Sequence, residues 1–218
     1  MAEVDADIWV LTETWIDYPP AEGYRLASQS FGAKDLLYSA NATKRCWVNI
    51  WVKSTAASTP QAVAHQTDRM ACSRIQLPGR RDLVVVGTVL PWGSSDGLWP
   101  GTDGYCDALI DQAEDWSRLR SDPRTCDFVS AGDFNIHFTY KSSYGRKTER
   151  TLSEALTAQN LQCLTSGNVP HTQKAAVDHI CVSRRTIRAE APTVGSWPIP
   201  SVHSKPITDH HGVFADIE

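Results

Sequence analysis

The chain has 218 residues, of which 41% are hydrophobic, and its formal net charge is −4. Single domains commonly reach about 200–250 residues, so we expect one domain over residues 1–218. Proteins that hold long duplex DNA usually carry a broad basic face, and the acidic charge of this chain argues against one. A local contact with nucleic acid stays compatible with the composition, because a bound divalent cation offsets acidic charge.

No apolar stretch approaches the roughly 18 residues of a membrane helix, so we expect no membrane span. The first residues are acidic and lack the basic and apolar regions of a signal peptide. The six cysteines are scattered without a CxxC pair, and we interpret them as reduced, mostly buried thiols. These features predict a cytoplasmic protein, and no obligate protein partner is evident.

In chain order, the pattern predicts strands first and helices later. Runs rich in β-branched and aromatic residues indicate strands over residues 7–12, 46–53, 71–77 and 82–90. Apolar residues at helical spacing predict a helix over residues 105–120, and a second helix is expected from about 147 to 159. Short strands are expected near Leu161, Ile180, Ile187 and Val213. This order indicates an α+β or mixed α/β sandwich rather than a regular βαβ alternation.

The tetrapeptide Gly132-Asp133-Phe134-Asn135 follows a short apolar strand over residues 128–131. On an extended chain, the side chains of Asp133 and Asn135 would lie on the same side. That arrangement places an acceptor for a water proton beside a carboxamide that both donates and accepts hydrogen bonds. Such a pair suits the hydrolysis of a phosphate ester. The alternative is that the two residues only satisfy a turn.

Three further acidic residues stand at strand ends. Glu13 follows the strand over residues 7–12, Asp178 opens the strand near Ile180, and Asp209 with His210 precedes the strand near Val213. Carboxylates at strand ends tend to meet at one edge of a sheet, where packing does not explain a charge. Oxygen ligands of this kind favour Mg²⁺ or Mn²⁺. The sequence therefore predicts a divalent-cation site.

These four motifs, in this order, resemble the endonuclease/exonuclease/phosphatase superfamily, which has the DNase I-like fold. The likeness runs from Asp7 to Val213 and rests on the segments DIWVLTE, GDFN, VDHI and TDH. It implies an α+β fold, a four-layer α/β/β/α sandwich of two mixed sheets. It also implies a metal-dependent phosphoesterase activity.

The resemblance implies a role for each catalytic residue. Asp133 would position or deprotonate the attacking water, and Asn135 would hold that water or a phosphoryl oxygen. His210 would bind the scissile phosphate and stabilise the charge that develops on it. Asp178 would orient His210 and favour its protonated form, as a neighbouring carboxylate should.

The metal site is implied in the same way. Glu13 would bind Mg²⁺ (or Mn²⁺), and Asp209 would complete the network of metal and water. Other interpretations stay open: Glu13 fits a solvated strand end, and Asp178 fits a structural partner of an arginine. The arginines that could pair with Asp178 are Arg184 and Arg185. A zinc site is a further possibility, for which the candidates are His203, His210 and His211. His137 and His179 are expected to have supporting or structural roles.

The chain departs from the family pattern in two places. Family members carry a metal-site Asn on a strand before the metal-binding Glu, and no Asn precedes Glu13. We therefore expect that first strand to be missing. Where repair nucleases carry a Tyr and DNase I-type members a His, this chain has Val89-Leu90-Pro91, which disfavours an endonuclease for abasic DNA. Trp92 and Trp99 are candidates for stacking on a base, worth about 1–3 kcal/mol per base, or for packing over the site.

Two segments are candidate substrate-binding loops. Residues 137–150 hold the densest basic patch, and we assign Tyr144, Arg146 and Lys147 to a phosphate-backbone clamp. Residues 91–104, with glycines and aromatic rings, form a candidate lid. For each segment the alternative is an ordinary solvated loop.

The leading hypothesis is a Mg²⁺-dependent phosphodiesterase, a nuclease whose substrate is single-stranded or small rather than long duplex. One alternative is a phosphatase or phosphodiesterase that acts on a small molecule or a lipid headgroup. Another is a non-catalytic protein of the same fold, whose metal site is disabled by the missing Asn.

Overall fold

The computed structural model describes residues 4–31, 45–92, 101–120, 126–138, 143–167, 176–187, 192–197, 201–202, 205–206 and 210–217. The chain divides into two compact units. The first comprises Met1–Val89 and Asp111–Gly132, and the second comprises Leu90–Ile110 and Asp133–Glu218. Both units are discontinuous in sequence, and a single domain over residues 1–218 stays a prediction.

The first unit contains a three-stranded antiparallel sheet in the order β1-β3-β2. These strands are β1 (Ile8–Trp15), β2 (Tyr24–Gln29) and β3 (Arg45–Lys53). The central strand β3 is buried on both faces, including the polar Asn49. Asn49 donates a hydrogen bond to the Trp15 carbonyl at 3.0 Å and accepts one from the Cys46 thiol at 2.9 Å. Its burial is therefore compensated, and it fixes the end of β1 just beyond Glu13.

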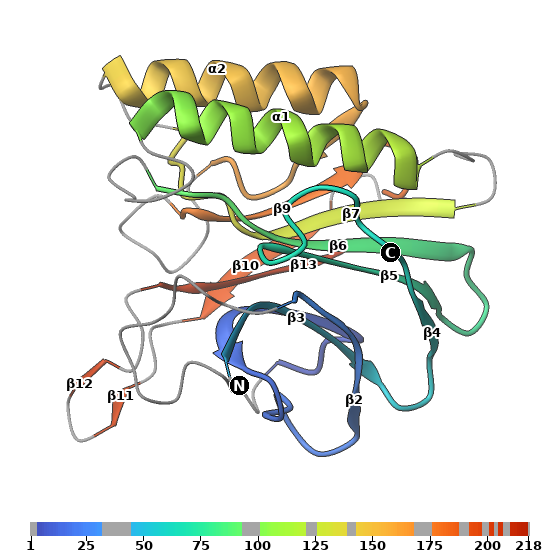
Figure 1. Ribbon diagram of the computed structural model, residues 1–218. Helices are drawn as coiled ribbons and strands as arrows, with labels where there is room; N and C mark the ends of the chain where they lie inside the picture. The colour runs from blue at the N-terminus through green and yellow to red at the C-terminus, as the bar shows by residue number, and fades with distance from the viewer. Residues whose placement is uncertain are drawn as a thin grey trace. The chain divides into compact units, whose positions relative to one another are not determined.

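Four further strands follow one another in a second sheet, in the order β4-β5-β6-β7. They are β4 (Ala57–Pro60), β5 (Met70–Gln76), β6 (Asp82–Val89) and β7 (Cys126–Asp133). Strands β5 and β6 face the three-stranded sheet (Figure 1). A Cβ on Gly87 would lie 2.4 Å from Cγ1 of Val48, so glycine is required at this contact between the two sheets.

The helix α1 (Gly101–Leu119) contributes its second half to the first unit. There the fully buried carboxylate of Asp115 accepts hydrogen bonds from the backbone N–H groups of Ala64 and His65. The same carboxylate forms an ion pair with Arg118. Burial alone would raise the pKa of Asp115, but the hydrogen bonds from Arg118, His65 and Ala64 lower it. This carboxylate therefore ties α1 to the segment before β5.

The second unit contains the first half of α1, the helix α2 and short strands. They are α2 (Ser143–Ala158), β8 (Leu161–Cys163), β9 (Asp178–Ser183), β10 (Thr193–Trp197), β11 (Ser201–Val202), β12 (Lys205–Pro206) and β13 (Gly212–Asp216). The antiparallel pairs are β8 with β9, β10 with β13 and β11 with β12. Helix α2 lies beside the first half of α1 (Figure 1), where Cys106 and Thr151 are 3.4 Å apart.

The predicted strands over residues 7–12, 46–53, 71–77 and 82–90 are all present, with ends that differ by at most three residues. Of the strand expected near Ile187, residues 184–186 form a turn and Ile187 belongs to no strand, whereas residues 188–191 lie outside the described residues. Both helices begin about four residues earlier than expected, so residues 101–104 belong to α1 and not to a lid.

All six cysteines are free thiols and five of them are buried. In the part of the chain that the structure describes, no helix is long and apolar enough to cross a membrane.

Candidate active site

Strand β7 ends with Gly132 and Asp133, so it extends two residues beyond the end of the predicted strand. Gly132 has φ +135, and a Cβ at this position would lie 2.1 Å from the backbone oxygen of Thr88. The close approach to β6 therefore admits only glycine. The next residue, Asp133, is 2% exposed, so its carboxylate is held in a buried position.

Asp133 and Asn135 meet through a turn and not along an extended chain, which corrects the expected geometry. Asn135 has φ +49, and its backbone N–H donates to Oδ1 of Asp133 at 2.8 Å. The Asn135 carboxamide nitrogen donates to Oδ2 of Asp133 at 2.8 Å and to the Leu90 carbonyl at 2.7 Å. Each oxygen of the Asp133 carboxylate thus receives a hydrogen bond from Asn135.

This bonding limits what Asn135 can do. A carboxamide nitrogen has two hydrogens, and here they go to Asp133 and Leu90. The carboxamide oxygen stays available as an acceptor for a water proton, whereas a hydrogen bond to a phosphoryl oxygen would require one of the existing bonds to break. The geometry thus favours an Asn135 that orients Asp133.

Asp178 and His210 form the second part of the site. Asp178 opens β9, and His210 stands two residues before β13. Nδ1 of His210 lies 2.9 Å from Oδ2 of Asp178, with side chains that are 32% and 16% exposed. Among the described side chains, Asp178 forms this ion pair and none with Arg184 or Arg185. The histidine is therefore the partner that the structure gives to Asp178.

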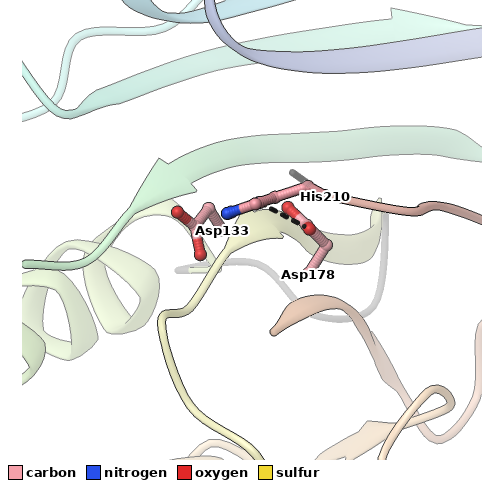
Figure 2. Close-up of side chains that lie close together, drawn as sticks. All are labelled: Asp133, Asp178 and His210. Carbon is pink, nitrogen blue, oxygen red and sulfur yellow. Dashed lines mark ion pairs between the residues drawn. The ribbon is translucent and has the colours of Figure 1, made fainter. Parts of the chain in front are cut away.

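Asp133, Asp178 and His210 converge in the second unit. One ligand atom from each lies within 4.8 Å of the other two. Figure 2 shows the Asp178 carboxylate against one side of the His210 ring, while the other side of the ring points toward Asp133. Three residues from three separate segments of the sequence thus form one polar cluster that is only partly exposed.

The chemistry of this cluster fits a divalent cation. Two carboxylates supply hard oxygen ligands, which Mg²⁺ and Mn²⁺ prefer, and Mn²⁺ also accepts an imidazole. The other predicted metal ligand, Glu13, lies in the first unit near the end of β1. It is exposed, has φ +51, and its backbone oxygen accepts a hydrogen bond from Arg45 at 2.8 Å. Asp209 and His203 lie outside the described residues.

The predicted substrate-binding residues occupy different kinds of position. Trp92 is 41% exposed and lies two residues after Leu90, whereas Trp99 lies outside the described residues. Tyr144 and Arg146 belong to the first turn of α2 and not to a loop, and the Tyr144 side chain is outside the described part. Lys147 forms an ion pair with Asp103 that raises the pKa of Lys147, and Arg146 is exposed.

Several residues that shape the site carried no catalytic signal in the sequence. Leu90 contributes only backbone groups: its N–H donates to the Asp133 carbonyl at 2.8 Å, and its carbonyl accepts from Asn135. Tyr105 donates its hydroxyl to the Phe134 carbonyl at 3.1 Å. Backbone contacts leave no trace in residue identity, so Leu90 was not predictable. Tyr105 appeared in the sequence only as an apolar position of a helix.

Comparisons with known proteins agree with this fold. The 3′-5′ exonuclease NExo from Neisseria meningitidis has a TM-score of 0.65 at 18% identity, over 100% of this chain and 91% of that one. The human Nocturnin catalytic domain with bound sulfate has a TM-score of 0.63 at 14% identity, over 96% and 80%. D. rerio TDP2 in complex with single-strand DNA product has a TM-score of 0.58 at 12% identity, over 96% and 84%. No curated protein gave a significant match.

These likenesses confirm the expected α+β, DNase I-like fold. The predicted absence of a first strand with a metal-site Asn stays a prediction. A model of the Endonuclease/Exonuclease/phosphatase family matches residues 1–210, which include all four motifs. The chain therefore belongs to the endonuclease/exonuclease/phosphatase family.

Proposed function

We propose that the protein is a divalent-metal-dependent phosphodiesterase that hydrolyses nucleic acid, with single-stranded or short molecules as its substrates. The cluster of Asp133, Asp178 and His210 carries this proposal. Phosphoryl transfer needs charge neutralisation and alignment more than covalent chemistry, and carboxylates with an imidazole supply both.

Asp133 would handle the attacking water. Its carboxylate is fixed by Asn135, which donates one hydrogen bond to each oxygen. Asp133 would accept the proton of the water as its oxygen attacks phosphorus, and the Asn135 carboxamide oxygen would orient the second hydrogen. Such positioned general-base catalysis typically contributes about 10²–10⁴-fold in rate.

His210 would act on the phosphate. Asp178 pairs with Nδ1, and the Nε2 side of the ring is directed toward Asp133. A proton on Nε2 would be donated to a phosphoryl oxygen as negative charge accumulates there. A bound Mg²⁺ or Mn²⁺ would supply further charge neutralisation, and Glu13 and Asp209 stay its predicted ligands.

The nucleic-acid substrate is supported by one solved structure of the same fold, a TDP2 described in complex with single-strand DNA product. In this chain, the exposed Arg146 in the first turn of α2 suits a phosphate contact, with Tyr144 and Lys147 as its neighbours. The exposed ring of Trp92 suits stacking on an unpaired base. Short or single-stranded substrates fit a protein whose net charge is −4.

The test is hydrolysis of single-stranded DNA, duplex DNA and RNA by the purified protein with Mg²⁺ or Mn²⁺. We expect Asp133→Ala and His210→Ala to lower kcat by about 10²–10³-fold or more. Asp17→Ala, which changes an exposed carboxylate in the turn after β1, is the matched control and should keep the wild-type rate. Cleavage at the wild-type rate in Asp133→Ala or His210→Ala would exclude the mechanism.

One observation favours a second candidate, a phosphodiesterase or phosphatase for a small molecule or lipid headgroup. Lys147 and Arg150 are engaged by acidic neighbours, Asp103 and Glu154, so the basic patch offers a polyanion little net charge. Turnover of small phosphate esters without any cleavage of DNA or RNA would favour this candidate. Absence of Mg²⁺ or Mn²⁺ binding in calorimetry would instead favour a non-catalytic protein.

A cytoplasmic location is proposed because all six cysteines are free thiols.

A further inference from the structure

His179 is the most deeply buried histidine among the described residues, and the proposed chemistry does not use it. It follows Asp178 on β9 and is 1% exposed. Successive side chains of a strand point to opposite faces, so Asp178 faces His210 while His179 points into the interior of the second unit. A buried imidazole needs partners for both ring nitrogens, and those partners indicate its role.

Both ring nitrogens of His179 are engaged. Nε2 lies 2.9 Å from the backbone oxygen of Ile136, and because a carbonyl only accepts, Nε2 carries the proton. Nδ1 lies 3.0 Å from Oγ1 of Thr165, and this hydroxyl also accepts the backbone N–H of Ile180 at 3.0 Å. Thr165 thus fixes the ring orientation to the backbone of β9.

The ring also contacts two phenylalanines of the segment that follows Asp133. The Phe134 centroid lies 5.8 Å away at an interplanar angle of 65°, and the Phe138 centroid lies 4.9 Å away at 71°. Both are edge-on contacts, which aromatic rings favour. The segment over residues 134–138 therefore contacts the imidazole through two aromatic rings and accepts a hydrogen bond from its Nε2–H at the Ile136 carbonyl.

We propose that His179 is a positioning residue: its ring, oriented by Thr165, fastens residues 134–138 to β9 and so sets the spacing between Asp133 and the Asp178–His210 pair. The inference rests on the proposed phosphodiesterase function. Asp178 and His179 are consecutive on one strand, as Asp133 and Phe134 are on the other segment. Loss of the His179 bond would let Asp133 move relative to His210 without removing either group.

The test compares two substitutions at this position. His179→Phe keeps a ring of similar shape and loses both hydrogen bonds, whereas His179→Gln can still donate to the Ile136 carbonyl. We expect His179→Phe to lower kcat by about 10–100-fold with KM within about twofold of wild type, because groups that orient catalytic residues have effects of this size. His179→Gln should recover most of that loss. A wild-type kcat in His179→Phe, or equal losses in both variants, would overturn the proposal.

A second pair of variants guards against simple unfolding. Thr165→Val removes the hydroxyl that orients the ring, and Thr186→Val removes another buried hydroxyl, which bonds Ser183 at the other end of β9. We expect Thr165→Val to lower kcat and Thr186→Val to keep it, at similar thermal stability. Equal effects on kcat in the two variants would show a general packing role and contradict the inference.

Hydrogen exchange separates this inference from the proposed function, since it does not need a substrate. In His179→Phe the amides of residues 134–138 should exchange faster than in wild type, including the Asn135 amide that bonds Asp133. If the wild-type protein cleaves no substrate, the proposed function fails, and exchange alone decides whether His179 holds this segment. Unchanged exchange in His179→Phe would refute the role of His179.

Discussion

At the scale of single residues, the shape of the backbone positions the candidate site as much as side-chain chemistry does. Asp133 is held by a turn that needs φ +49 at Asn135 and by a strand end that needs φ +135 at Gly132. Asn and Gly are the residues that adopt such angles at least cost. The sequence motif therefore encodes a backbone geometry together with its two polar side chains.

Gly132→Ala tests this geometry. A methyl group would lie 2.1 Å from the Thr88 carbonyl oxygen, and the unusual φ adds strain that typically costs about 1–3 kcal/mol. We expect the free energy of unfolding in urea to fall by at least about 2 kcal/mol, or the protein to fail to fold. At Gly167, which also lies in the described part, an added Cβ would meet nothing within 4 Å. Gly167→Ala should therefore leave stability nearly unchanged, and equal effects of both substitutions would contradict the steric argument.

Asp178→Asn tests the pairing with His210. The substitution keeps the shape of the side chain but removes its charge, so a neutral carboxamide would face the imidazole in place of the carboxylate that lies 2.9 Å away. We expect kcat to fall by about 10²-fold, as for removal of one group that stabilises charge in a transition state. The thermal midpoint of the variant, measured by circular dichroism, should stay close to that of wild type because Asp178 is partly exposed. An undiminished kcat would show that His210 needs no such partner.

The sequence named Asp133, Asn135, Asp178 and His210 because charged residues at the ends of apolar strands stand out from a packing pattern. It did not reveal how they are held. The Leu90 carbonyl and the Asn135 turn are backbone features that many residue types would provide equally well. His179 was expected to be structural, and its contacts with Ile136 and Thr165 give that expectation a definite form.

At the scale of elements, strands with dense apolar character were predictable and polar ones were not. Strand β3 combines Trp and β-branched residues and is buried throughout, whereas β2 has one fully buried residue, Ala27. A helix start was also misplaced. Helix α2 begins at Ser143 and includes Gly145, which costs about 1 kcal/mol of helix propensity, so the periodic pattern becomes visible only near Lys147.

Asp115 gives the α1 element a pH dependence. Hydrogen bonds from Arg118 and the backbone of His65 and Ala64 hold its pKa below the ordinary value of 3.8. A lowered folded-state pKa stabilises the fold above the ordinary value, and the contribution is lost as pH falls toward the folded-state value. We therefore expect the difference in thermal midpoint between wild type and Asp115→Asn to be large at pH 7 and to shrink below about pH 4.

Thermal unfolding followed by circular dichroism at pH 7, 5, 4 and 3 measures this difference. Asp17→Asn, at an exposed position of the same unit, controls for the general effect of removing a carboxylate. A difference between wild type and Asp115→Asn that stays constant from pH 7 to pH 3 would show that the charge of Asp115 contributes nothing to stability.

At the scale of the whole molecule, the order of the motifs identified the fold although identity to the solved structures is only 12–18% for the three compared. The core tolerates exchange of apolar residues of similar volume, so sequence identity is lost while the fold persists. The polar residues at the strand ends cannot be exchanged in this way if they take part in catalysis. What sequence left open is the substrate, because surface charge can be neutralised by neighbours that only a structure shows.

The salt dependence of nucleic-acid binding follows from this charge arrangement. Arg146 is exposed, whereas Lys147 and Arg150 already face Asp103 and Glu154. We therefore expect one or two phosphates to be neutralised on binding. Each phosphate of a single strand contributes a slope of about −0.7 to the logarithm of the binding constant against the logarithm of salt concentration, so the total should lie between about −0.7 and −1.4.

Fluorescence anisotropy of a labelled single-stranded oligonucleotide, titrated with the inactive Asp133→Asn variant at several KCl concentrations and constant Mg²⁺, measures that slope. Adding Arg146→Ala should reduce its magnitude by about 0.7, because one phosphate contact is lost. Arg184→Ala, an exposed arginine in the turn after β9, should leave the slope unchanged. A slope of about −4 or steeper would require a basic surface larger than these residues provide. It would show that other parts of the chain make most of the phosphate contacts.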